Sequence, residues 1–269
     1  MLSTAKAVEN IKSVKVQGAR QIALYALKFL KGFAKKNGFG LKFEVASMLL
    51  ENARPTAVVL HNALQIVNKK KNMKTLDSLI KQLETSKEKI GRVGSKIVKN
   101  NSKILTHCHS SEVMSVLTNS KKKKILVIAT ETRPIFQGIT TVKELAKEKI
   151  PAILIVDSAA GHFIKAVDSV IVGSDAIRKE GVVNKVGTLQ IALLAKEFKR
   201  PFYVVGNTLK FDRRKALKIE ERPANEVHEK IEGVKIRNPA FDIVPWKYVT
   251  AVITEKGIFK PEKIVRMLK

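Results

Sequence analysis

The only cysteine of this 269-residue chain lies where a catalytic group is expected. Cys108 falls in the run Ile-Leu-Thr-His-Cys-His-Ser-Ser-Glu at residues 104–112. Ile104 and Leu105 are typical of a short buried strand, and Ser110 or Ser111 can cap the helix that follows. In an open α/β sheet such a turn lies at the carboxyl end of a strand, where ligands bind, and helix-start amides favour anions and a thiolate. The sequence therefore predicts an anion-binding turn with a reactive thiol.

Plainer interpretations of this turn stay open. A single cysteine is often only a small buried apolar residue. His107, Cys108 and His109 are potential metal ligands, but neighbouring strand residues point to opposite faces, so we expect no metal site. Hydrogen bonds to the backbone can account for both histidines.

Other polar residues follow apolar runs that are typical of buried strands. They are Glu131 and Arg133, Asp157, Asp175 and Lys210. We expect these residues to line the crevice at one edge of a parallel sheet, although turn formation and helix capping would also explain them. Neither a G-x-G-x-x-G nor a Walker A sequence occurs, so no nucleotide cofactor is predicted.

Composition and charge narrow the class of protein. The net charge is +27, but residues 1–100 carry 20 basic and 6 acidic side chains and the remainder carry 31 and 18, so neither half is singled out. With only 6% aromatic residues and no nucleic-acid-binding motif, this distribution favours small anionic ligands, and nucleic acid is not an expected partner. No apolar run is long enough for a membrane span, no secretory signal is seen and no internal disulfide can form, so we expect a cytoplasmic protein.

The hydrophobic pattern predicts two domains. Residues 1–100 have helical spacing throughout, interrupted at Gly18 and at Pro55, which fits the first turn of a helix. From Ile104 the pattern alternates between strands and helices, which indicates a parallel sheet. The predicted fold class is α/β, with an all-helical domain at 1–100 followed by a mainly parallel sheet domain at 101–269. Arg54, at a helix junction, is either a capping group or an anion clamp.

Seven ordered blocks, which span nearly the whole chain, resemble one known superfamily. It contains the alpha, beta and delta subunits of translation initiation factor 2B and two sugar-phosphate isomerases. The blocks are Ala53-Arg54-Pro55-Thr56-Ala57, Thr106-His107-Cys108-His109-Ser110, Glu131-Thr132-Arg133-Pro134, Gly173-Ser174-Asp175-Ala176-Ile177, Asn184-Lys185-Val186-Gly187-Thr188, Lys210-Phe211 and Asn238-Pro239-Ala240-Phe241-Asp242.

The archaeal ribose-1,5-bisphosphate isomerases look like the nearest branch, because they carry a cysteine in a His-Cys turn and an aspartate in a Gly-X-Asp-Ala segment. The resemblance implies that Cys108 and Asp175 are the catalytic pair and that the substrate is a phosphorylated sugar. It implies a Rossmann-like second domain, no cofactor, and dimers that assemble into homohexamers. The substrate-binding residues carried over by the resemblance are Gln17, Gly18, Ala19, Arg20, Arg54, Ser110, Asn184, Lys185 and Lys210.

One block departs from the isomerase pattern. These isomerases usually have an Arg-Gly-Ala-Gly phosphate turn, whereas this chain has Gln-Gly-Ala-Arg at residues 17–20. This change supports a noncatalytic regulatory subunit as an alternative, while Cys108 and Asp175 support the enzyme. A methylthioribose-1-phosphate isomerase is a third possibility, with an apolar pocket in place of a second phosphate site. Lys210 and the overall charge favour the bisphosphate.

The chemistry requires a base at C2 of the sugar and an acid at the ring oxygen. We expect the helix start and nearby cations to lower the pKa of the Cys108 thiol, so that it can act as the base. The apolar neighbours of Asp175 are expected to raise the pKa of its carboxyl group. Finally, Arg237–Trp246 is an apolar, proline-containing segment that either covers the second domain's core or forms a dimer interface.

Overall fold

The computed structural model describes residues 3–13, 15–16, 18–216 and 219–269. Two compact units, Met1–Ser86 and Lys87–Lys269, are described separately below. The division falls within one long helix, α5 (Met73–Gly94). The sequence predicted a domain boundary after residue 100, and that boundary stays a prediction.

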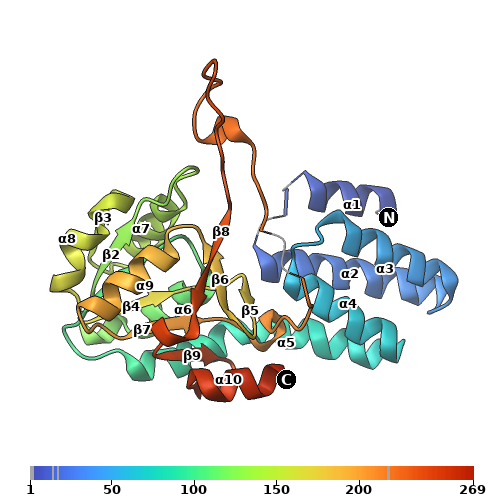
Figure 1. The fold of residues 1–269 in the computed structure, drawn as a ribbon. Helices are drawn as coiled ribbons and strands as arrows, with labels where there is room; N and C mark the ends of the chain where they lie inside the picture. Colours follow the sequence, from blue (N-terminus) through green and yellow to red (C-terminus); the bar gives the residue numbers. More distant parts are fainter. Residues whose placement is uncertain (1–2, 14, 17, 217–218) are drawn as a thin grey trace. The chain divides into compact units, whose positions relative to one another are not determined.

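The first unit is helical (Figure 1). Its amphipathic helices bury one stripe each, as the spacing of Leu27, Leu30 and Ala34 on α2 (Ala19–Asn37) illustrates. Pro55 lies in the turn before α4, not inside the first turn of that helix as the sequence predicted. The helices are α1 (Thr4–Lys12), α2 (Ala19–Asn37), α3 (Leu41–Ala53), α4 (Val58–Lys70) and the first part of α5.

The second unit is built on a seven-stranded sheet with the order β10-β9-β7-β4-β1-β2-β3. All neighbours are parallel except the β9–β10 pair. The strands are β1 (Lys103–Thr106), β2 (Leu126–Thr130), β3 (Ala152–Ile155), β4 (Ser169–Val172), β7 (Phe202–Val205), β9 (Ala251–Thr254) and β10 (Gly257–Phe259). The predicted α/β class with a mainly parallel sheet is confirmed.

Apolar residues on both faces explain why this sheet is parallel and covered by helices on each side. On β4, Val170 and Val172 belong to one core cluster, while Ile171 between them belongs to the other. The first cluster includes residues of α8, α9 and α10, and the second those of α6 and the end of α5. The helices are α6 (Ser111–Asn119), α7 (Gln137–Lys147), α8 (Ala160–Phe163), α9 (Thr188–Glu197) and α10 (Pro261–Leu268).

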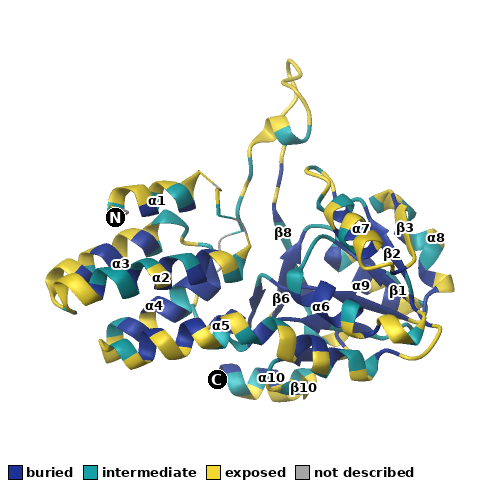
Figure 2. Ribbon diagram, turned by 180° about the vertical axis from the view of Figure 1, so that it is seen from behind, coloured by how far each residue is buried: buried dark blue, intermediate teal, exposed yellow. Residues whose placement is uncertain are grey.

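A second, antiparallel sheet was not predicted from the sequence. It has the order β5-β6-β8, with β5 (Ala176–Ile177), β6 (Gly181–Lys185) and β8 (Phe241–Pro245). The chain before β8 rises from the second unit as an arm, residues 219–240, whose tip is exposed (Figures 1 and 2). Within the described residues, no helix is long and apolar enough to cross a membrane.

Candidate active site

Cys108 lies directly after β1, in the turn that leads into α6. Ser110 caps α6, because its hydroxyl accepts a hydrogen bond from the Val113 amide at 3.4 Å, so the predicted strand-turn-helix is confirmed. Cys108 has a φ of 66°, a left-handed conformation that is rare outside glycine, asparagine and aspartate. A backbone outlier at a strand end is typical of a functional position.

The parallel register brings the ends of β1 and β4 together. Gly173 follows β4 so closely beside Ser110 that a Cβ atom on Gly173 would lie 2.8 Å from the Ser110 Cβ. The same Cβ would lie 3.8 Å from Oδ1 of Asn184, which is buried at the end of β6. Three expected site segments, those of Ser110, Gly173–Asp175 and Asn184, therefore converge at the carboxyl edge of the sheet.

The charges of Lys185 and Asp175 both act on the pKa of the Cys108 thiol. Burial raises the thiol pKa to about 12, the charge of Lys185 lowers this pKa, and the carboxylates of Asp175 and Asp157 raise it. The amide of His109 also stabilises the thiolate and lowers the pKa. The expectation that the helix start and cations lower the thiol pKa below its ordinary value is therefore wrong, because burial outweighs both effects.

Lys185 combines burial with an aromatic contact. Its side chain is 5% exposed, and its ammonium lies 5.4 Å from the ring centre of Phe241 on β8, which pairs with β6. The helix that follows Lys185, α9, is not an open anion site, since Oδ2 of Asp242 accepts hydrogen bonds from the Gly187 and Leu189 amides at 2.9 and 3.0 Å. An incoming phosphate would have to displace that carboxylate from α9.

Lys210 occupies a different setting from the one expected of a phosphate-binding lysine. It is 5% exposed and its ammonium pairs with Oε2 of Glu112, at the start of α6, at 2.5 Å. The other oxygen of Glu112 accepts a hydrogen bond from the Asn207 side chain at 2.7 Å. The positive charge of Lys210 is thus largely balanced within the protein before any ligand binds.

The remaining expected binding residues belong to the helical unit. Gln17 lies outside the described residues. Gly18 (φ 83°) and Ala19 begin α2, and the guanidinium of Arg20 donates a hydrogen bond to the Leu83 carbonyl at 3.3 Å. Arg54 is the C-terminal cap residue of α3. The role of these residues in substrate binding stays a prediction.

Three polar residues around the thiol, Thr132, Thr141 and His107, were not identified as site residues from the sequence, whereas Asp157 was expected to line the crevice. Hydroxyls of Thr132 and Thr141 bind the backbone of Cys108, Asp157 binds the amides of Thr132 and Arg133, and His107 bridges to Thr130 and Val186. Asp157 and the Thr132 block were visible as strand-end residues, but their mutual contacts depend on strand register. The side chain of His109 contacts α7 instead, where its Nε2 lies 3.1 Å from Oε1 of Glu144.

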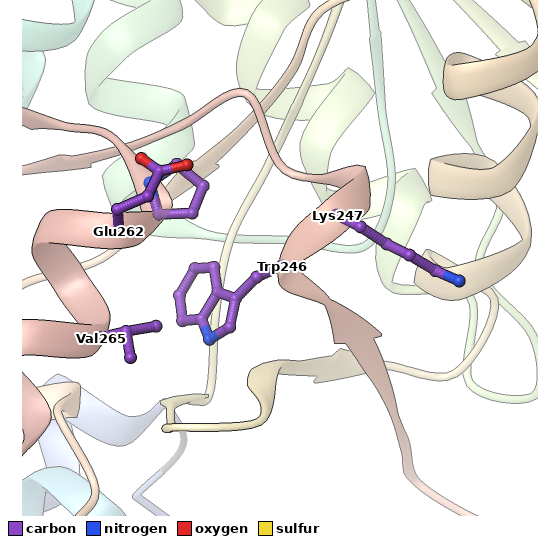
Figure 3. A pocket seen from close by; sticks show the side chains of 5 residues that line it. Trp246, Lys247, Glu262 and Val265 are labelled. Carbon is purple, nitrogen blue, oxygen red and sulfur yellow. The ribbon is translucent and has the colours of Figure 1, made fainter.

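A separate hollow of about 370 Å³ lies between the turn after β8 and α10 (Figure 3). The residues that line it are Trp246, Lys247, Pro261, Glu262 and Val265. None of the expected site residues lines it. Trp246 donates hydrogen bonds through its indole nitrogen to the carbonyls of Arg178 and Lys179, and it packs against the core, so its side chain is engaged within the chain.

Known proteins are similar to this chain along almost its full length. A ribose 1,5-bisphosphate isomerase of Archaeoglobus fulgidus is 41% identical, over 97% of this chain and 91% of that protein. A methylthioribose-1-phosphate isomerase of Acetivibrio thermocellus is 37% identical, over 94% and 87%. The crystal structure of a translation initiation factor 2B from Pyrococcus horikoshii superimposes with a TM-score of 0.84 at 28% identity, covering 97% of this chain and 98% of that one.

The model of one protein family, the Initiation factor 2 subunit family, matches residues 15–261. This range covers most of both units of the fold. It includes the residues of the candidate site at the strand ends, Cys108, Asp157, Asp175, Lys185 and Lys210. The chain therefore belongs to the Initiation factor 2 subunit family.

Proposed function

We propose that this protein is a sugar-phosphate isomerase that converts ribose 1,5-bisphosphate to ribulose 1,5-bisphosphate. The observation that carries the proposal is the convergence of three segments, the turn of Cys108 and Ser110, Gly173–Asp175 and the end of β6 at Asn184, at the carboxyl edge of the sheet. The relatives named as ribose 1,5-bisphosphate isomerases, 41% identical in two archaea, support the same substrate.

The reaction needs two proton-transfer groups and keeps both phosphates. In the proposed reactive form the proton shared by the pair is on Asp175 and the negative charge is on the sulfur of Cys108, where Lys185 stabilises it. Asp175 gives its proton to the ring oxygen as the bond from C1 to that oxygen breaks. The thiolate takes the proton from C2, which leaves an enol. The thiol then returns a proton to C1 while the hydroxyl proton on C2 passes to Asp175, which restores both groups.

The Lys210–Glu112 pair supports a second candidate, methylthioribose-1-phosphate isomerase. A lysine that is already neutralised by a buried carboxylate attracts a second phosphate less than a lone lysine would. Purified protein should therefore be incubated with each sugar phosphate separately and the ketose product measured. Turnover of ribose 1,5-bisphosphate at the higher kcat/KM would support the proposal. Turnover of methylthioribose 1-phosphate alone would replace it, and turnover of neither would favour a regulatory subunit.

Arg54 and Lys210 are predicted to bind the substrate phosphates. Arg54→Met should weaken binding of ribose 1,5-bisphosphate about 10- to 100-fold, the effect of losing charge-assisted hydrogen bonds, and should make the remaining binding less sensitive to salt. Calorimetry at two ionic strengths measures both effects. Arg92→Met is the matched control, because Arg92 is an exposed arginine paired with Glu88. Equal affinity and salt dependence in Arg54→Met and the native chain would reject the assignment.

The Lys210 variant needs a compensating change. Lys210→Met alone leaves the carboxylate of Glu112 buried without its cation, which typically destabilises a fold by about 3–5 kcal/mol. Lys210→Met combined with Glu112→Gln removes both charges while the new amide oxygen still accepts from Asn207. Binding to the double variant therefore reports on the phosphate contact without that penalty.

We also propose that the protein forms homodimers that assemble into a homohexamer. The expected interface at Arg237–Trp246 stays part of this proposal, although β8 pairs with β6 and Trp246 donates hydrogen bonds within the chain. Further candidates are the exposed apolar residues of the edge strand β3 and its end, Ile153, Leu154 and Val156, and those at the tip of the arm, Ile231 and Val234.

Light scattering at micromolar concentration is expected to give the mass of a hexamer, or of a dimer at the least. Leu154→Lys, which places a charge on the exposed edge strand, should shift this mass toward the monomer. Ile258→Lys on β10, at the other edge of the same sheet, is the control. A monomeric native chain would rule out the assembly, and a dimer alone would rule out only the hexamer.

A further inference from the structure

Both backbone polar groups of Cys108 are bound by threonine hydroxyls, one from the turn after β2 and one from α7. The Cys108 amide donates to Oγ1 of Thr132 at 2.9 Å, and the hydroxyl of Thr141 donates to the Cys108 carbonyl at 3.0 Å. Each bond holds the residue in its left-handed conformation, which would otherwise relax toward the ordinary regions. The direction in which the thiol points is therefore set outside its own strand and helix.

Thr132 is itself held in an uncommon conformation. Its φ is 64° and its side chain is fully buried. The two carboxylate oxygens of Asp157, just beyond β3, accept hydrogen bonds from the Thr132 amide at 2.8 Å and the Arg133 amide at 2.7 Å. Asp157 thus fixes the turn that presents the Thr132 hydroxyl to Cys108.

His107 anchors the other side of the same turn. Its Nε2 lies 2.8 Å from the Val186 carbonyl oxygen and its Nδ1 lies 2.6 Å from the Thr130 hydroxyl, and burial lowers the pKa of His107, which favours the neutral ring. A neutral ring satisfies both partners without adding a charge beside the thiol. The turn is consequently tied to β2, β3 and the segment after β6.

We propose that Thr132 and Asp157 are positioning residues, which hold Cys108 in its left-handed conformation so that the sulfur is directed at C2 of the substrate. This inference rests on the proposed function. Neither residue needs to touch the substrate, because each acts through the backbone of Cys108 or of Thr132. Misplacing a reacting group by about 1 Å can cost on the order of 100-fold in rate, so a lost hydrogen bond at this turn should reach the chemistry.

Thr132→Val tests the hydrogen bond without changing any charge. The turnover number should fall about 10- to 100-fold, while KM stays within about threefold because the substrate contacts are untouched. Thr132→Ser keeps the hydroxyl and should recover most of the native turnover. Asp157→Asn is the second variant. The asparagine side chain has one oxygen, so it can accept a hydrogen bond from only one of the two backbone amides.

Alkylation of Cys108 by iodoacetamide gives a readout that does not depend on turnover. Because the chain has one cysteine, the alkylation rate reports on that thiol alone. In the native chain the rate should rise about tenfold per pH unit between pH 7 and 10, below the thiol pKa of about 12. The charged groups that act on the thiol are Lys185, Asp175 and Asp157. Thr132→Val leaves all three in place, so faster alkylation in this variant would come from release of the turn.

Asp168→Asn is the matched control. Oδ2 of Asp168 accepts the Lys103 amide at 2.7 Å, so it plays the same structural part at the opposite end of β1. It should leave both turnover and alkylation unchanged. The inference is overturned if Thr132→Val retains native turnover, or if it loses turnover while the alkylation profile stays native. A native chain that fails to isomerise either sugar phosphate would sink the proposed function, and the alkylation comparison would still decide whether Thr132 positions the thiol.

Discussion

Cys108→Ser is expected to lower turnover of ribose 1,5-bisphosphate by about 10³-fold, in the range typical for loss of a general acid-base group. The serine hydroxyl has nearly the shape of the thiol and the same backbone bonds to Thr132 and Thr141 are available to it. It is a far weaker acid, so it cannot supply an anion to remove the C2 proton. Thermal melting and substrate binding should stay close to native, because the loss is confined to proton transfer.

Cys108→Ala gives the comparison that isolates the proton transfer. If serine and alanine are equally inactive while both bind substrate, then the thiol acts as a base and not as a hydrogen-bond donor. Turnover of Cys108→Ser within about threefold of the native chain would exclude the thiol as the C2 base. The third result, an unfolded serine variant, would show that Cys108 is instead a packing residue.

The local features of the site were predictable from the sequence, because they depend on neighbours in the chain. A short apolar strand, a serine cap and a cysteine between them lie within nine residues, and the structure has the strand, the cap at Ser110 and the turn. The parallel sheet was predictable for a similar reason, since its strands are nearly continuous apolar runs.

Contacts between distant segments were not predictable in the same way. Asp157 reaches Thr132 only because Thr130 of β2 pairs with Ile155 of β3, a register that the sequence does not state. Lys210 and Glu112 are 98 residues apart, so the neutralisation of that lysine could not be foreseen. The antiparallel sheet was missed because β5 has two residues and β6 mixes apolar with polar side chains.

The thiol pKa shows how burial can reverse an argument from charge alone. The cationic neighbour expected from the sequence is present as Lys185, and it lowers the pKa as expected. Burial acts in the opposite direction and is the larger effect, so the thiol pKa lies above its ordinary value. The raised thiol pKa also makes stability depend on pH. Because the folded thiol holds its proton more tightly than the unfolded one, the folded state is favoured below pH 9, and this contribution is lost as pH rises from about 9 to about 12.

Asp175→Asn is expected to reduce turnover about 10²- to 10⁴-fold while alkylation of Cys108 becomes faster. The amide can replace the carboxylate in size, and the backbone amide of residue 175 keeps its hydrogen bond to the Val183 carbonyl, which measures 2.8 Å in the native chain. It cannot, however, transfer a proton to the ring oxygen, so ring opening slows. Removing the negative charge also lowers the thiol pKa, because Asp175 raises it in the native chain. More thiolate is then present at any pH below the pKa.

These two opposite changes make the Asp175 experiment specific. A variant that merely loosened the fold would lose turnover and melt at a lower temperature, whereas Asp175→Asn should melt close to native and react faster with iodoacetamide. Asp168→Asn, at the far end of the sheet, serves again as the control for loss of one aspartate charge. Native turnover in Asp175→Asn would remove Asp175 from the mechanism. Slower alkylation would show that its carboxylate does not act on the thiol, and the proposed sharing of one proton between the two groups would then have to be abandoned.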